Sequence, residues 1–206
     1  MAELTAPGPV HLRRSPLSHL ETRMRAAAVT GARGVRLAEW PFLTMVNLRV
    51  APASDAADRI GKTLGAPLPQ RCGHTAASGP HTVLWLGPDE WLVVSRTDGP
   101  SVATELREAL AGDPGSVVDL SANRTTLELS GPAARQVLEK GCPLDLHPRD
   151  FGPGRAVSTT VGPVAVLLWQ VDDAPTYRLL PRSSFADYLA RWLIDAMNEY
   201  RAPEIP

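Results

Sequence analysis

Thr82-Val-Leu-Trp-Leu-Gly-Pro-Asp-Glu-Trp-Leu-Val-Val94 decides the fold class, because it holds two apolar runs separated by a short polar segment. The runs at 82–86 and 91–94 are rich in β-branched and aromatic residues, which favour strands. The intervening Gly87-Pro88-Asp89-Glu90 favours a tight reversal of the chain. The stretch therefore predicts an antiparallel β-hairpin.

Strand and helix patterns flank this hairpin on both sides. Upstream, residues 43–50 predict another strand, after which Ser54 is expected to cap a helix that Gly65 ends. Downstream, Pro100 opens a helix that Gly112 ends, and residues 117–120 predict a short strand. The first half thus has the order strand, helix, two strands, helix, strand.

The second half repeats this order at an offset of roughly eighty residues. Residues 125–130 predict a strand, Gly131-Pro132 begins a helix that Gly141 closes, and three strands follow at 157–161, 164–169 and 177–180. Ser184 and Asp187 resemble a capping box for a helix over residues 184–199. The apolar stripe of that helix consists of Phe185, Leu189, Trp192, Leu193, Ala196 and Met197.

The simplest fold for this pattern is α+β, a single domain built from two duplicated strand-helix-strands-helix units at about 40–120 and 121–200. Residues 1–15 have no periodic apolar pattern, so we expect residues 1–17 to form an extended N-terminal arm. The domain then covers residues 18–200, and residues 201–206 form a C-terminal tail.

Composition and charge exclude several classes of function. Pro and Gly contribute 20 and 16 of the 206 residues, so many turns separate short elements. The 21 Lys and Arg residues and 22 Asp and Glu residues give a net charge of −1, which offers no field for nucleic acid or an anionic membrane. No apolar run approaches the ~18 residues that span a bilayer, and the N-terminus lacks the core of a secretory signal. We therefore expect a cytoplasmic protein.

The sequence offers no complete catalytic or metal-binding motif. Residue types suited to zinc occur at Cys72, His74, Cys142 and His147. Their spacings are not those of the usual zinc sites. There is no G-x-S-x-G elbow around a serine, and Gly152-Pro153-Gly154 lacks the fingerprint of a phosphate-binding loop. We predict no catalytic residue and no metal ligand in this chain.

Several motifs, in order along the chain, resemble the gamma subunit family of heterotetrameric sarcosine oxidase. They are Leu86-Gly-Pro-Asp-Glu-Trp-Leu92, Val118-Asp-Leu-Ser-Ala-Asn-Arg-Thr-Thr-Leu-Glu-Leu-Ser-Gly-Pro132 and Gly141-Cys-Pro-Leu-Asp-Leu146. Ser15-Pro16-Leu17 and residues 182–193 also resemble that family, so the similarity covers residues 15–195. Two segments, 70–74 and 154–160, depart from the family's usual pattern.

The resemblance implies a fold similar to the folate-binding fold of the glycine-cleavage T-protein and a place in a complex with alpha, beta and delta subunits. In such oxidases the alpha subunit is expected to bind NAD and tetrahydrofolate and the beta subunit FAD. FMN is expected between alpha and beta, and zinc on delta. The gamma subunit is expected to hold no cofactor. The complex oxidises sarcosine with oxygen to glycine, hydrogen peroxide and methylenetetrahydrofolate.

The resemblance implies that this chain is a non-catalytic subunit that stabilises the flavin-bearing assembly. We expect Ser15, Pro16, Leu17 and Trp40 to contact a partner subunit. One alternative is an oxidase acting on another N-methyl amino acid. A second is a folate-binding, aminomethyltransferase-like protein, in which Asp173 of the turn Val171-Asp-Asp173 would face folate. A third is a free-standing α+β scaffold with an unrelated partner.

Overall fold

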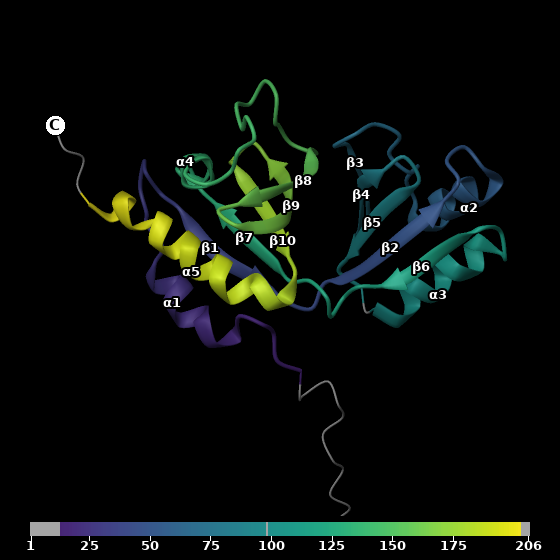
Figure 1. Cartoon of the computed structure of the whole chain (residues 1–206), viewed down its shortest axis with the longest axis horizontal. Coiled ribbons are helices and arrows are strands. Elements are labelled where there is room, and N and C mark those ends of the chain that lie inside the picture. The colour runs from purple at the N-terminus through teal and green to yellow at the C-terminus, as the bar shows by residue number, and fades with distance from the viewer. Residues whose placement is uncertain (1–12, 98, 203–206) are drawn as a thin grey trace, which may run out of the picture.

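Two antiparallel five-stranded sheets pack face to face, and helices cover their outer faces (Figure 1). The computed structural model describes residues 13–97 and 99–202. The layers are helix, sheet, sheet, helix. The α+β prediction is thereby confirmed.

The first sheet has the strand order β3-β4-β5-β2-β6. Its strands are β2 (Thr44–Val50), β3 (Thr75–Ser78), β4 (His81–Gly87), β5 (Glu90–Ser95) and β6 (Gly115–Asp119). Helices α2 (Asp55–Leu64) and α3 (Gly99–Leu110) cover it. The predicted hairpin is confirmed as β4 and β5. Ser54 Oγ accepts a hydrogen bond from the Ala57 amide, and Gly65 ends α2 at φ 74°, as predicted.

The second sheet has the strand order β1-β7-β10-β9-β8. Its strands are β1 (Arg36–Trp40), β7 (Thr126–Ser130), β8 (Ala156–Val161), β9 (Val164–Asp172) and β10 (Thr176–Pro181). Helices α1 (Glu21–Ala26), α4 (Ala134–Glu139) and α5 (Ala186–Ala196) cover it. Single 3-10 turns lie at Ser18–Leu20, Ser183–Phe185 and Asn198–Arg201. The sequence did not predict α1, β1 or β3.

The two sheets correspond strand by strand, because the order β6-β2-β5-β4-β3 matches β1-β7-β10-β9-β8. The corresponding edge strands come from different places along the chain. In the first sheet the edge strand next to β2 is β6, which follows its own half. In the second sheet the edge strand next to β7 is β1, which precedes the first half. The second duplicated unit therefore gains its edge strand only when β1, from near the start of the chain, pairs with β7.

Alternation along the strands divides the interior into three apolar clusters. On β5, Trp91 and Val93 face α2 and α3, whereas Leu92 and Val94 face the opposite sheet. The period of two that separates the faces of a strand accounts for this division. Within the described residues, no helix is long and apolar enough to cross a membrane.

The start of α5 differs from the prediction. A 3-10 turn at Ser183–Phe185 leads into the helix, so Phe185 occupies the N-cap position and no side chain caps it. The predicted capping box of Ser184 and Asp187 is therefore wrong. Phe185 is also wrong as a member of the apolar stripe, because it is 52% exposed.

Candidate functional site

A cleft of about 390 Å³ lies between the two sheets, and Trp40, Trp169 and Arg178 line it. Strand pairing brings these residues together. Arg178 on β10 lies opposite Trp169 on β9 and opposite Glu128 on β7. Trp40, at the end of β1, reaches the same place because β1 pairs with β7 on its other side.

The Arg178 side chain is held on three sides. Its guanidinium carbon lies 4.1 Å from the centre of the Trp40 ring and 4.9 Å from that of Trp169. Its Nε donates a hydrogen bond to Glu128 Oε2 at 3.1 Å. Glu128 is buried, and Arg36 approaches its other oxygen at 4.0 Å. A guanidinium stays protonated, so this group can donate hydrogen bonds into the cleft but cannot act as a base.

The last residues of the predicted N-terminal arm already contact the domain. Its residues 1–12 lie outside the described part of the chain. Ser15 Oγ donates to Glu39 Oε2 at 2.6 Å, and Thr125 Oγ1 donates to Glu39 Oε1 at 2.6 Å. Pro16 is exposed, but the Leu17 side chain is wholly buried in the cluster under α1 and α5. The Leu17 side chain therefore anchors this segment to its own domain.

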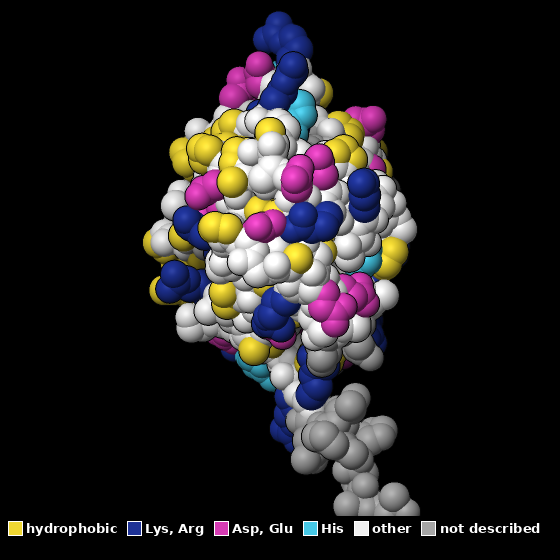
Figure 2. Space-filling model, turned by 90° about the vertical axis from the view of Figure 1, so that its right-hand side faces the viewer, with side chains coloured by type: hydrophobic (Ala, Val, Ile, Leu, Met, Phe, Trp, Pro, Cys, Tyr) yellow, Lys and Arg dark blue, Asp and Glu magenta, His cyan; other side chains and the backbone are white. Residues whose placement is uncertain are grey.

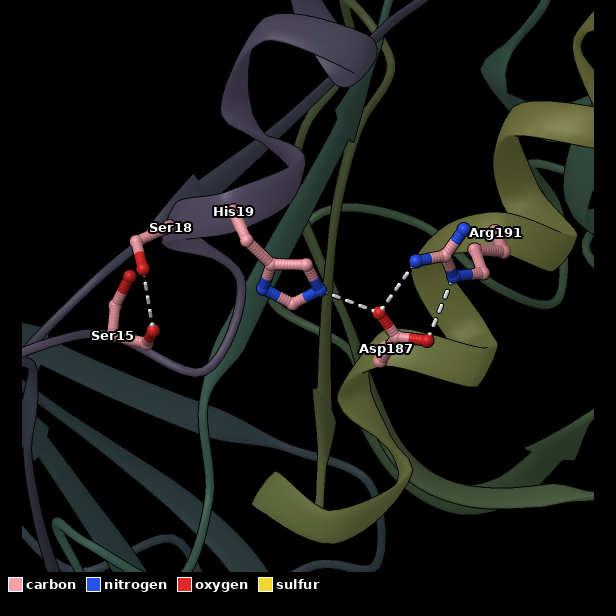
Figure 3. A network of polar contacts seen from close by, with 5 residues as sticks. All are labelled: Ser15, Ser18, His19, Asp187 and Arg191. Carbon is pink, nitrogen blue, oxygen red and sulfur yellow. Dashed lines mark hydrogen bonds and ion pairs between the residues drawn. The ribbon is translucent and has the colours of Figure 1, made fainter.

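A polar network ties the start of the domain to α5 (Figure 3). His19 Nε2 and Asp187 Oδ1 lie 2.7 Å apart, and Arg191 Nε donates to Asp187 Oδ2 at 2.8 Å. The hydrogen bond from Arg191, followed by that from His19, holds the pKa of the Asp187 carboxyl below its ordinary value. Ser18 Oγ instead donates to the Ser15 carbonyl. The network thus joins segments 168 residues apart in sequence and does not form a serine–histidine pair.

Asp173 lies exposed in the turn between β9 and β10. Its neighbour Asp172 accepts a hydrogen bond from the Ala174 amide, which is the usual role of an acidic residue in a turn. Among the described residues, no three His, Cys, Asp or Glu side chains are grouped closely enough to hold a metal ion. Cys142 is buried in the apolar cluster beneath α5, and Cys72 is exposed.

The sequence predicted Trp40 as a site residue, but it did not predict Arg178, Glu128 or Trp169. Glu128 and Arg178 occupy central positions of short apolar strands, and a charge there is a detectable signal. On a single sheet such residues would face solvent. They are buried because the first sheet packs against the face of the second sheet that carries them.

Comparison with known proteins gives matches along the whole chain. The family described as "Sarcosine oxidase, gamma subunit family" matches residues 49–199. A sarcosine oxidase subunit gamma from Arthrobacter sp is 47% identical over 206 residues, which is all of both chains. The solved heterotetrameric sarcosine oxidase from Corynebacterium sp. U-96, in complex with pyrrole 2-carboxylate, has a chain that is 45% identical with a TM-score of 0.90. The match covers 95% of this chain and 100% of that one.

A more distant match concerns the fold alone. The glycine cleavage system aminomethyltransferase T from Bartonella henselae is 14% identical with a TM-score of 0.66. The match covers 89% of this chain and 57% of that chain. The predicted similarity to the T-protein fold is confirmed.

Proposed function

We infer that this chain, which belongs to the sarcosine oxidase gamma subunit family, is a non-catalytic subunit that stabilises the flavin-bearing assembly of a heterotetrameric sarcosine oxidase. The observation that carries this proposal is similarity of 45–47% identity over the full length of both chains. Its partners are the alpha, beta and delta subunits, and the assembly works in the cytoplasm.

The assembly oxidises the N-methyl group of sarcosine. Oxygen takes up the two electrons and becomes hydrogen peroxide, and the oxidised one-carbon unit passes to tetrahydrofolate. The products are glycine, hydrogen peroxide and methylenetetrahydrofolate. FAD, FMN, NAD, tetrahydrofolate and zinc are held by the other subunits.

The charged groups of this chain support a structural role. Glu128 is engaged with Arg178, and Glu39 accepts hydrogen bonds from two hydroxyl groups. Asp187 is engaged with His19 and Arg191. These carboxylates join strands of the second sheet to one another, and join the N-terminal segment to that sheet and to α5. Ser15, Pro16 and Trp40 are the residues through which we expect the domain to meet a partner.

The test is co-expression of the tagged chain with its alpha, beta and delta subunits, followed by size-exclusion chromatography and a flavin absorbance spectrum. We expect a yellow complex that oxidises sarcosine, and a colourless chain when it is expressed alone. A complex lacking this chain should lose activity faster on heating. A colourless monomer that does not co-elute with those subunits would contradict the proposal. An assembly equally stable without this chain would contradict the stabilising role.

The deletion of residues 1–16 tests the docking segment and leaves Leu17 in the core. We expect less of the truncated chain to co-purify with the other subunits than of the full chain. Equal co-purification with full activity would show that the segment takes no part in docking. Trp40→Phe keeps an aromatic ring at the cleft, so we expect it to reduce co-purification less than the deletion does.

A further inference from the structure

A second hollow lies where the chain crosses from one half to the other. Its wider part, of about 870 Å³, includes Phe42, Asp119 and Arg124 in its lining. Its narrower part, of about 300 Å³, includes Arg124, Arg182 and Phe185. Arg124 lines both parts, so they lie side by side, and we call the two together the arginine groove.

Among the described residues that line the arginine groove, basic side chains outnumber acidic ones. The charged residues that line it are Arg13, Arg14, Asp119, Arg124 and Arg182. Asp119 is already engaged, because its Oδ1 accepts hydrogen bonds from the amide and hydroxyl of Ser121. Among the described residues, neither Arg124 nor Arg182 forms an ion pair with a carboxylate. By contrast, the face formed by α2 and α3 shows basic and acidic side chains interspersed (Figure 2).

The two central arginines oppose each other. Arg124 Nη1 donates to the Leu180 carbonyl at 2.7 Å, which holds its guanidinium in place. Backbone pairing places Arg182 beside it. Burial, and then the charge of Arg182, lowers the pKa of Arg124. Two adjacent cations that form no ion pair with a described carboxylate repel each other in the isolated chain, and an anion between them would relieve that cost.

An exposed aromatic ring stands in each part of the groove. Phe42 is 47% exposed and Phe185 is 52% exposed. Phe42 has φ 61°, a conformation that bulky L-residues rarely adopt, and its ring lies 4.6 Å from the Arg13 guanidinium. Exposed aromatic residues around arginines are typical of the anchoring residues of protein interfaces.

We propose that the arginine groove receives an acidic segment of a partner subunit, whose carboxylate binds between Arg124 and Arg182 while apolar neighbours cover Phe42 and Phe185. The proposal rests on the proposed function, because the partner is a subunit of the same assembly. The groove is separate from the cleft lined by Trp40 and Arg178, since the two share no lining residue.

Charge reversal at Arg182 tests the groove in the assembled enzyme. Untagged wild-type chain and a tagged variant are co-expressed with the alpha, beta and delta subunits, and mass spectrometry gives the ratio retained in the complex. We expect Arg182→Glu to be retained at about one tenth of wild type or less, because it places like charges together. Arg182→Gln should be retained at an intermediate ratio. Arg149→Glu makes the same charge change at an exposed residue outside the groove and is the control.

The same variants separate binding from folding. Removing the charge of Arg182 relieves its repulsion of Arg124, so isolated Arg182→Gln should unfold at the same urea concentration as wild type or a higher one. Retention of Arg182→Glu equal to that of Arg149→Glu would overturn the assignment of the groove. If wild type and the control also fail to enter the complex, the proposed function itself is wrong.

Photo-crosslinking identifies the occupant. A benzophenone amino acid in place of Phe185, in the assembled enzyme, should crosslink to a partner peptide that contains Asp or Glu. A crosslink to residues 1–12 of this chain, to a second copy of it or to a peptide without an acidic residue would overturn the proposal. An intact complex without any crosslink at this position would overturn it as well.

Discussion

Glu128→Gln should destabilise the chain far more than the same change at an exposed ion pair. The side chains of Glu128 and Arg178 are 10% and 14% exposed, with 3.1 Å between Oε2 and Nε. The variant removes the carboxylate charge and leaves the Arg178 guanidinium between two tryptophan rings without its counter-ion. Removing one member of a buried pair costs about 3–5 kcal/mol.

The expected loss lies at or just below the lower end of that range. Arg178 lines the cleft, where water reaches part of its guanidinium, and its contacts with Trp40 and Trp169 remain. The glutamine carbonyl can also still accept from Arg178 Nε. We therefore expect the free energy of unfolding to fall by about 2–3 kcal/mol, which is roughly a 30- to 160-fold change in the unfolding equilibrium.

Urea unfolding of the isolated chain, followed by tryptophan fluorescence, measures this loss. Glu21→Gln is the matched control, because Glu21 and Arg25 form an exposed pair at 2.6 Å with 68% and 75% exposed side chains. Although this pair is shorter, it should contribute only about 0.3–0.5 kcal/mol. If Glu128→Gln costs no more than Glu21→Gln, burial does not decide the strength of these pairs and the reasoning is wrong.

Three further changes have expected outcomes. Gly131→Ala places a Cβ 2.5 Å from the Gly34 carbonyl oxygen at φ 115°, so thermal unfolding should show a loss of about 2 kcal/mol or more. Burial, and then the hydrogen bond with Glu199, raises the pKa of Tyr200 to about 12. The raised pKa therefore contributes to stability below pH 10, and this contribution is lost as the pH rises from 10 to 12. Over that range, the stability of Tyr200→Phe measured by urea unfolding should depend less on pH than that of wild type. Asp173→Asn should leave turnover of the assembled enzyme unchanged in a sarcosine oxidation assay, and loss of turnover with assembly intact would favour chemistry at this turn.

The elements that the sequence predicted are those whose signals are local. The hairpin of β4 and β5 lies within 15 residues, and its turn residues stand between its strands. Likewise, Ser54 and Gly65 mark α2 through contacts within the helix itself. Such signals need no knowledge of the rest of the fold.

The edge strand β1, which pairs with a strand of the second half, could not be predicted in this way. β1 has five residues, and in its burial pattern only Leu37 is buried. Its partner β7 lies about 90 residues further along the chain, and a short half-exposed strand carries little periodic signal of its own. The pairing becomes evident only from the matching strand orders of the two sheets.

The start of α5 shows how a local motif can be outweighed by distant contacts. Ser184 and Asp187 have the spacing of a capping box, but the carboxylate of Asp187 is bound by Arg191 and His19 instead. The 3-10 turn before α5 shifts the N-cap to Phe185. A side chain that joins two distant segments is then unavailable to cap its own helix.

The two segments that we expect to depart from the family's usual pattern, 70–74 and 154–160, lie against each other in the fold. The Ala156 amide donates to the Gly73 carbonyl at 2.9 Å, and Arg155 Nη1 donates to the Cys72 carbonyl at 3.3 Å. A Cβ at Gly73 would lie 2.9 Å from Arg155 Nη2, and the φ of 74° at Gly73 also disfavours a side chain there. Gly154 also lines the cleft of Trp40 and Arg178. Two segments that are far apart in the sequence are therefore neighbours in the fold, located beside the cleft between the sheets.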